Sequence, residues 1–181
     1  PSAELSLSPL VSAKTLTEQA HVRQSHQLLA WQIPLAANAA TLAKHRISIR
    51  ALQLALKNLP QHPDYRLIWN PLPPKSYLII MTQQTSASDV HDQLLDLLLG
   101  ETSDSLLSEV IKQEVEQYQS SSLTALDAIE WFELSALLRF PYHSDLSYRE
   151  TINQISTEDI RQHLTEILTN QHRFSLTLIP Y

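Results

Sequence analysis

Histidines and carboxylates are the side chains of this sequence that could take part in chemistry, because the chain contains no cysteine. Without thiols, disulfides, thiolate nucleophiles and thiolate zinc sites are excluded. His21 and His26 are five residues apart, and on one strand this spacing points them to opposite faces. They are therefore not expected to bind one metal ion together. The serines stand near no histidine and acid whose spacing would indicate a hydrolase triad.

A second group of ionisable residues lies just ahead of Gly100, the only glycine of the chain, and consists of Asp89, His91, Asp92 and Asp96. We interpret these residues as the solvated face of a helix, because acidic side chains are favourable near a helix start. A single glycine is too few for a phosphate-binding loop, which needs several residues without a Cβ. The sequence therefore predicts no nucleotide site of the P-loop or Rossmann type.

Composition indicates a soluble globular protein, with 181 residues, a hydrophobic share of 43% and a charged share of 18%. This length favours one domain over residues 1–181. The net charge of −6 would repel nucleic acid and anionic membranes, and no apolar run reaches the roughly 20 residues of a membrane span. Because the chain starts at Pro1 without methionine, we expect a C-terminal piece of a longer protein. The sequence does not decide between the cytoplasm and the periplasm for a soluble protein of this kind.

Hydrophobic spacing in the first half predicts a strand, a helix and a hairpin. Strand-forming residues run over 21–35 and end at Pro34, and the apolar spacing of seven, three, four and three over 38–59 is a helical stripe that Pro60 stops. Two short strand-like runs, 65–69 and 76–82, are separated by a proline-rich connection. We expect these two runs to pair as an antiparallel hairpin.

The second half predicts several helices and a last strand. The helices are expected over 90–98, 103–119, 126–140 and 148–155, followed by one that begins at Ser156, and alternation predicts a strand over 174–178. Ser86 or Ser88 would cap the first of these helices, Gly100 would end it in a left-handed conformation, and Ser147 with Glu150 would form a capping box.

The clearest local pattern is residues 155–160, where Ser156 caps the helix, Asp159 reaches back to it and Ile155 packs on Ile160. The element order predicts an α+β fold, a mainly antiparallel sheet with helices packed on one face. The fourth predicted helix carries a group of large apolar residues, Trp131, Phe132, Leu137 and Phe140. These residues could form a patch that faces a partner, but core packing is more frequent for such spacing and is what we expect.

This order, with the helix start at 155–160 and the last strand at 173–180, resembles the repeated domain of the insulinase-like (pitrilysin-type) zinc metallopeptidases. The resemblance covers nearly the whole chain. It implies two halves that close around an unfolded peptide, each built of two such domains, with zinc held by one domain only. The partner would be a zinc-bearing homologous domain in cis or in trans, and the ligand a peptide.

The zinc domain of that family carries His-x-x-Glu-His on a helix, and the sequence has no such motif. The nearest match is His163-Leu164-Thr165-Glu166-Ile167, whose second histidine position is an isoleucine of the predicted apolar stripe. We therefore expect no cofactor in this chain and zinc in the partner. The resemblance implies a non-catalytic domain of a zinc metalloendopeptidase.

The same resemblance implies that the non-catalytic half contributes an arginine and a tyrosine to the active site, from the end of the helix and the start of the hairpin. Tyr65 matches the tyrosine, whereas Lys57 stands for the arginine and Asp64 for a glycine. Lysine lacks the bidentate fork of arginine, so binding of substrate by Lys57 and Tyr65 is expected in place of catalysis. The other interpretation of Tyr65 is a strand residue that anchors the hairpin. The alternatives are a structural or assembly subunit of the same fold without a proteolytic role, and an unrelated α/β binding module.

Overall fold

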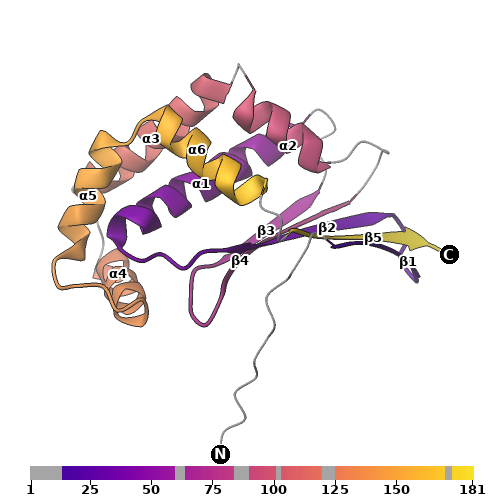
Figure 1. Cartoon of the computed structure of the whole chain (residues 1–181), viewed down its shortest axis with the longest axis horizontal. Coiled ribbons are helices and arrows are strands. Elements are labelled where there is room, and N and C mark those ends of the chain that lie inside the picture. The colour runs from indigo at the N-terminus through magenta and orange to yellow at the C-terminus, as the bar shows by residue number, and fades with distance from the viewer. Residues whose placement is uncertain (1–13, 60–63, 84–89, 101–102, 120–124, 170–172) are drawn as a thin grey trace, which may run out of the picture.

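The chain forms two layers, a sheet and a set of helices that cover one of its faces, in the computed structural model (Figure 1). The structure describes residues 14–59, 64–83, 90–100, 103–119, 125–169 and 173–181. The strands are β1 (Lys14–Ala20), β2 (His26–Ile33), β3 (Tyr65–Asn70), β4 (Ser76–Gln83) and β5 (Arg173–Pro180). The helices are α1 (Ala39–Lys57), α2 (Val90–Leu99), α3 (Ser103–Gln119), α4 (Ala125–Leu137), α5 (Ser144–Gln154) and α6 (Thr157–Leu168).

The strands of the described sheet follow the order β1-β5-β2-β4-β3. β1 pairs with β5 in parallel, and the other neighbours are antiparallel. The expected α+β fold, a mainly antiparallel sheet with helices on one face, is confirmed. β1 was not predicted from the sequence, and the strand predicted over 21–35 is shorter because residues 21–25 connect β1 to β2.

Helix α1 lies at the centre of the helical layer and packs on the covered face of the sheet. It begins at Asn38, whose side-chain oxygen accepts a hydrogen bond from the Thr41 amide at 2.8 Å. Its predicted apolar stripe is fully buried, together with alternate residues of β2 and β4 and the inner side of α6. The buried set includes Leu29, Trp31, Ile33, Leu42, Leu52, Leu56, Leu78, Ile80, Ile160, Leu164 and Leu168.

The start of α6 follows the predicted capping box. Ser156 Oγ accepts a hydrogen bond from the Asp159 amide, and Asp159 accepts one from the Ser156 amide, both at 3.1 Å. These bonds also lower the pKa of Asp159, the Ser156 hydroxyl being the largest cause. Lys44 of α1 reaches the same carboxylate at 3.3 Å, so the cap also joins α6 to α1.

Of three predictions about helix ends, two are wrong and one lies outside the described residues. The capping box at Ser147 and Glu150 is wrong, because α5 begins a turn earlier at Ser144, after His143 in a left-handed conformation (φ 66°). Gly100 does not have a positive φ, so its predicted left-handed end is also wrong. A Cβ at Gly100 would lie 2.2 Å from the Asp96 carbonyl oxygen, and this close approach accounts for the glycine. The predicted caps Ser86 and Ser88 lie outside the described residues.

The aromatic group of α4 divides between the core and the surface. Trp131 meets the buried Tyr148 ring edge-on at 5.0 Å, and Phe140 packs against the core as predicted. Phe132 and Leu137 are 65% and 55% exposed, so their predicted core position is wrong. The reason is geometric, because Trp131 and Leu134 occupy the side of α4 that faces the helical layer.

A buried polar cluster joins α1, α3 and α5. Glu114 is fully buried, accepts a 2.7 Å hydrogen bond from the Tyr148 hydroxyl and lies 2.5 Å from the guanidinium of Arg50. The Arg46 guanidinium stands 5.8 Å from the centre of the Tyr148 ring. Burial is the main cause that raises the pKa of Tyr148, so this hydroxyl stays protonated and donates to Glu114.

Candidate functional site

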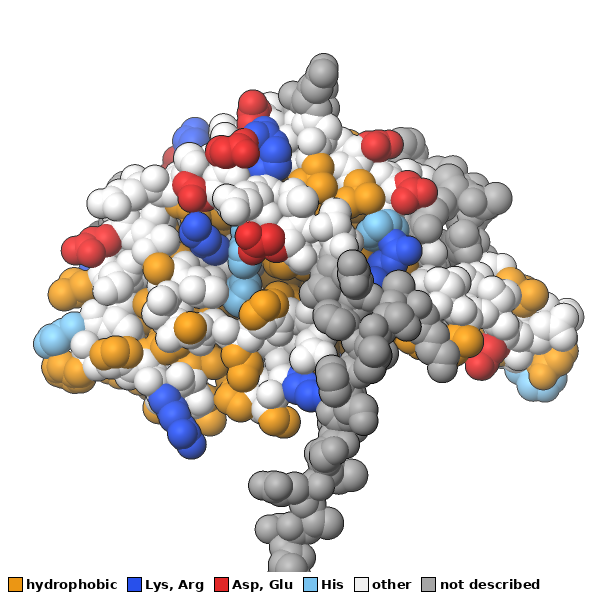
Figure 2. Space-filling view, viewed as in Figure 1, with side chains coloured by type: hydrophobic (Ala, Val, Ile, Leu, Met, Phe, Trp, Pro, Cys, Tyr) orange, Lys and Arg blue, Asp and Glu red, His pale blue; other side chains and the backbone are white. Residues whose placement is uncertain are grey.

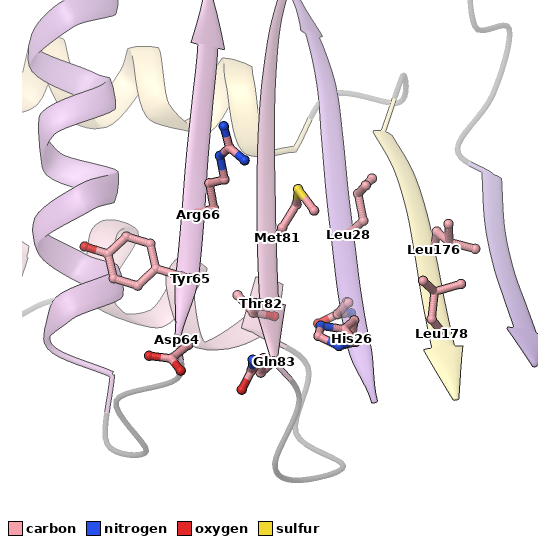
Figure 3. A pocket seen from close by; sticks show the side chains of 11 residues that line it. His26, Leu28, Asp64, Tyr65, Arg66, Met81, Thr82, Gln83, Leu176 and Leu178 are labelled. Carbon is pink, nitrogen blue, oxygen red and sulfur yellow. The ribbon is translucent and has the colours of Figure 1, made fainter. Parts of the chain in front are cut away.

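The open face of the sheet, opposite the helices, carries a shallow groove of about 320 Å³ over β3, β4, β2 and β5 (Figure 3). The strand register aligns its side chains in two rows across these strands. One row is Arg66, Met81, Leu28 and Leu176, and the other is Asp64, Gln83, His26 and Leu178. Each row is polar or charged near β3 and apolar near β5.

The change from polar side chains near β3 to apolar ones near β5 determines which ligand groups the groove could contact. Leucine and methionine side chains supply an apolar floor, while Arg66 and Asp64 place both charge signs beside the edge strand. Figure 3 shows Arg66, Met81 and Leu28 as neighbours on this face. The groove is suited to binding an apolar side chain next to a polar backbone.

Tyr65 borders the groove but points to the other face of the sheet. Its ring extends toward α1 in Figure 3, and its hydroxyl donates a long hydrogen bond of 3.4 Å to the Gln53 carbonyl. The ring is half-buried and packs against the core. Tyr65 therefore anchors the first residue of β3 to the last turns of α1.

Lys57 is an exposed residue in the last turn of α1. It stands four residues after Gln53, and residues four apart share one face of a helix. The hydroxyl of Tyr65 thus reaches the turn of α1 that directly precedes Lys57. The two residues predicted to bind substrate belong to one corner of the fold, where α1 ends and β3 begins.

The backbone at this corner has its own binding capacity, because β3 is the last strand of the described sheet on that side. The Gln83 amide donates to the Asp64 carbonyl at 3.0 Å, and these two residues are opposite each other. Alternate residues of an antiparallel strand turn their backbone groups to the partner, so those of Tyr65, Leu67 and Trp69 face outward. No other strand of the described residues pairs with this edge of β3, which starts beside the end of α1 that carries Lys57.

Helix α6 carries residues 163–167, the nearest match to the His-x-x-Glu-His zinc motif. His163 Nδ1 lies 3.6 Å from Glu166 Oε2 on α6, but Ile167 is buried in the core, as its place in the apolar stripe predicted. The position of a second zinc ligand is therefore part of the packing, and these residues do not fit a zinc site. No three histidine, aspartate or glutamate side chains among the described residues stand close enough to hold a metal ion.

His163 has a neighbour that the sequence analysis missed. Its ring lies 4.8 Å from the ring of His45 on α1, and His45 also meets the edge of Trp69 on β3. His45 is 2% exposed, and burial, with a smaller contribution from His163, lowers its pKa to about 4. Burial also lowers the pKa of His163. The signal was present, because 42, 45, 49, 52 and 56 form one helical stripe.

The other histidine predictions have separate outcomes. His91 is buried, with Nε2 3.1 Å from the Leu168 carbonyl oxygen, so the solvated face predicted for it is wrong. It lies on the side of α2 that packs on α6, whereas Asp92 and Asp96 are exposed as expected. Asp89 lies outside the described residues. His21 precedes β2 and its ring lies 4.6 Å from that of Tyr181, so the common strand assumed for His21 and His26 is absent.

Comparison with known proteins finds similarity in structure. No protein-family model and no curated protein sequence matches the chain. A protease from Helicobacter pylori superposes with a TM-score of 0.72 at 12% identity, over 96% of this chain and 46% of that chain. The inactive domain of an M16 peptidase from Pseudomonas fluorescens gives 0.69 at 12%, over 94% and 44%.

A third similar structure is a ferredoxin protease in complex with Arabidopsis ferredoxin, with a TM-score of 0.61 at 14% identity, over 93% of this chain and 20% of that chain. The chain spans less than half the length of each of these three proteins. Identities this low show the fold alone. The chain therefore has the fold of M16-like, insulinase-family peptidase domains, and its sequence lacks the His-x-x-Glu-His motif.

Proposed function

We propose that this chain is a non-catalytic domain of an insulinase-like zinc metalloendopeptidase, and that it helps to enclose and bind the peptide substrate. The observation that carries the proposal is the backbone edge of β3 beside the groove, with which no strand of the described residues pairs. An extended peptide would add to this edge as a further strand. The zinc and the water-activating glutamate would belong to a homologous partner domain, in cis or in trans.

In this proposal Tyr65 and Lys57 frame one end of the bound peptide. Tyr65 holds the first residue of β3 against α1, and Lys57 supplies a positive charge at the adjacent helix end. A lysine offers a point charge without a planar fork, which suits contact with a carbonyl or carboxylate of the peptide. The chain would act by binding and positioning, while the partner cleaves.

Backbone-methylated peptides provide the sharpest test, because methylation removes an amide donor and leaves the side chain. Three versions of a short peptide with leucine at alternate positions are titrated onto the chain: unmodified, methylated on odd amides, and methylated on even amides. Since only one edge of a peptide strand faces β3, one methylated version should bind at least about tenfold more weakly and the other should bind normally.

Equal binding of all three peptides, or no binding of the unmodified one, would contradict strand addition. Tyr65→Ala and Lys57→Ala should each weaken binding several-fold. Lys112→Ala is the matched control, because Lys112 lies on the exposed side of α3 and pairs with Glu116 at 3.8 Å. If Lys112→Ala weakens binding as much as Lys57→Ala, the contribution of Lys57 is general charge and not a local contact.

An alternative function, a structural or assembly subunit of the same fold, is favoured by one separate observation. Large apolar side chains are exposed on α4 and just after it, away from the groove. No helix in the described part of the chain is long and apolar enough to cross a membrane. What the exposed α4 side chains bind is a question independent of peptide cleavage.

A further inference from the structure

Helix α4 is apolar on two sides. Trp131, Leu134 and the following Leu138 pack against the helical layer. On the outer side, Ile129, Phe132 and Ala136 are exposed at spacings of three and four, so they form a second stripe along the same helix. A helix normally packs its apolar stripe against another element, so a second stripe that stays exposed indicates a surface available to a partner.

The outer stripe is part of a large exposed surface, which we call the α4 surface and define as Ile129, Phe132, Ala136 and Leu137. Tyr142 and Leu146, which follow it in the chain, are 83% and 53% exposed. At roughly 175 Å² for a large apolar side chain, the exposed parts of Ile129, Phe132 and Leu137, which are 52%, 65% and 55% exposed, amount to about 300 Å². Figure 2 shows hydrophobic side chains gathered over α4 and the start of α5, at the lower left. Patches of this size on a monomer are often binding sites.

The charge around this surface selects its partner. Among the described side chains of residues 129–146, Glu133 and Asp145 are carboxylates and Arg139 is a cation, and the chain as a whole has a net charge of −6. Two copies of this chain would bring the same excess of negative charge together, which opposes self-association. A surface with apolar side chains bordered by lysine or arginine complements it in both respects.

We infer that the α4 surface is a docking site for a helix of another protein whose apolar stripe is bordered by basic residues. The apolar stripe of Ile129, Phe132 and Ala136 would pack against the leucine-like side chains of that helix. Glu133, which is exposed beside the stripe, would face its basic border. This inference does not rest on the proposed function, because the groove and the β3 edge take no part in it.

The test uses a synthetic helical peptide of leucine and lysine, with leucines at spacings of three and four, and a counterpart with glutamate in place of lysine. Binding of each labelled peptide to the chain is followed by fluorescence anisotropy in 0.15 M salt. The lysine peptide should bind and the glutamate peptide should bind at least about tenfold more weakly. Phe132→Ser should weaken binding of the lysine peptide about tenfold, and Ile129→Ser should act in the same direction.

The matched control is Tyr77→Ser, which removes another exposed aromatic, 39% exposed, from the open face of β4. It should leave binding unchanged, while Glu133→Lys should weaken it about threefold and more strongly at low salt. Equal affinity for both peptides, or an effect of Tyr77→Ser equal to that of Phe132→Ser, would overturn the inference. Sedimentation that detects a dimer of the parent chain, abolished by Phe132→Ser, would assign the surface to a second copy and also overturn it.

Discussion

The two faces of the sheet differ in what they leave to a partner. On β4, Leu78 and Ile80 point to the covered face and are fully buried beneath the helices. Tyr77 and Met81 of the same strand point to the open face and are 39% and 43% exposed. Both faces are rich in apolar side chains, so composition alone does not distinguish them.

The two faces differ in whether capped and mutually bonded helices cover them. The covered face is held by α1 and α6, whose ends are capped and joined through Lys44 and Asp159, and by the buried Glu114 cluster between α1, α3 and α5. The open face carries the groove where the covered face carries helices. We therefore expect the covered face to provide stability and the open face to provide binding capacity. Substitutions can test both statements.

Leu78→Ala should have the largest effect, a loss of about 3 kcal/mol in the free energy of unfolding, because it leaves a cavity under α1 where nothing is exposed. Urea melts followed by circular dichroism measure this directly. A loss below about 1 kcal/mol would mean that the helical layer is packed loosely, and that the contrast between the two faces is not one of stability.

Acid should weaken the covered face through His45. Its folded pKa of about 4 lies below its ordinary value of 6.5, so the unfolded chain binds a proton more readily than the folded one. Stability is therefore complete above pH 6.5 and is lost as the pH falls toward 4, by about 2 kcal/mol between pH 7.5 and pH 5. His163 contributes in the same direction, because its pKa is also lowered.

The groups around His45 make this prediction specific. His163 faces it from α6 and Trp69 from β3, with Lys44 next to it in the chain and Glu166 beside His163. Thermal melts from pH 7.5 to pH 5 should show a steeper loss for the parent than for His45→Gln, whose side chain does not titrate. If both proteins lose stability equally, the acid sensitivity belongs to other groups.

Ser156→Ala should cost about 1 kcal/mol, since it removes one cap of a helix that otherwise remains packed. Thr165→Ala is a matched control on the exposed side of the same helix, where the hydroxyl only bonds back to the Arg161 carbonyl at 2.8 Å. Denaturation midpoints that are equal for the two variants would mean that the capping box adds nothing to stability.

Sequence patterns predicted the parts of this fold that are fixed locally. The capping box at Ser156 depends on residues three apart, and the stripe of α1 depends on helical spacing, so both could be read directly. His45 belongs to the same stripe, so its burial could have been predicted. It was missed because a histidine is not counted as apolar. The resemblance identified the fold because the order of elements is itself a local sequence property.

Features set by distant residues were not predicted. β1 gains its place by pairing with β5, more than 150 residues away, and the groove exists because four strands align their side chains in register. The exposure of Phe132 depends on which side of α4 faces Tyr148, which helical spacing alone does not decide. The roles of Tyr65 and Lys57 were taken from a resemblance and remain proposals.

Met81→Ala should have a smaller effect than Leu78→Ala or Ser156→Ala, a change of less than about 0.5 kcal/mol in the free energy of unfolding. Met81 belongs to the same strand as Leu78, so the backbone context is matched and only the face differs. Its side chain lies beside Leu28 on an uncovered surface, and its removal leaves no enclosed cavity. A loss near that of Leu78→Ala, measured in the same urea melts, would mean that the open face stabilises the isolated chain. It would then be a second core and not a surface kept available for a ligand.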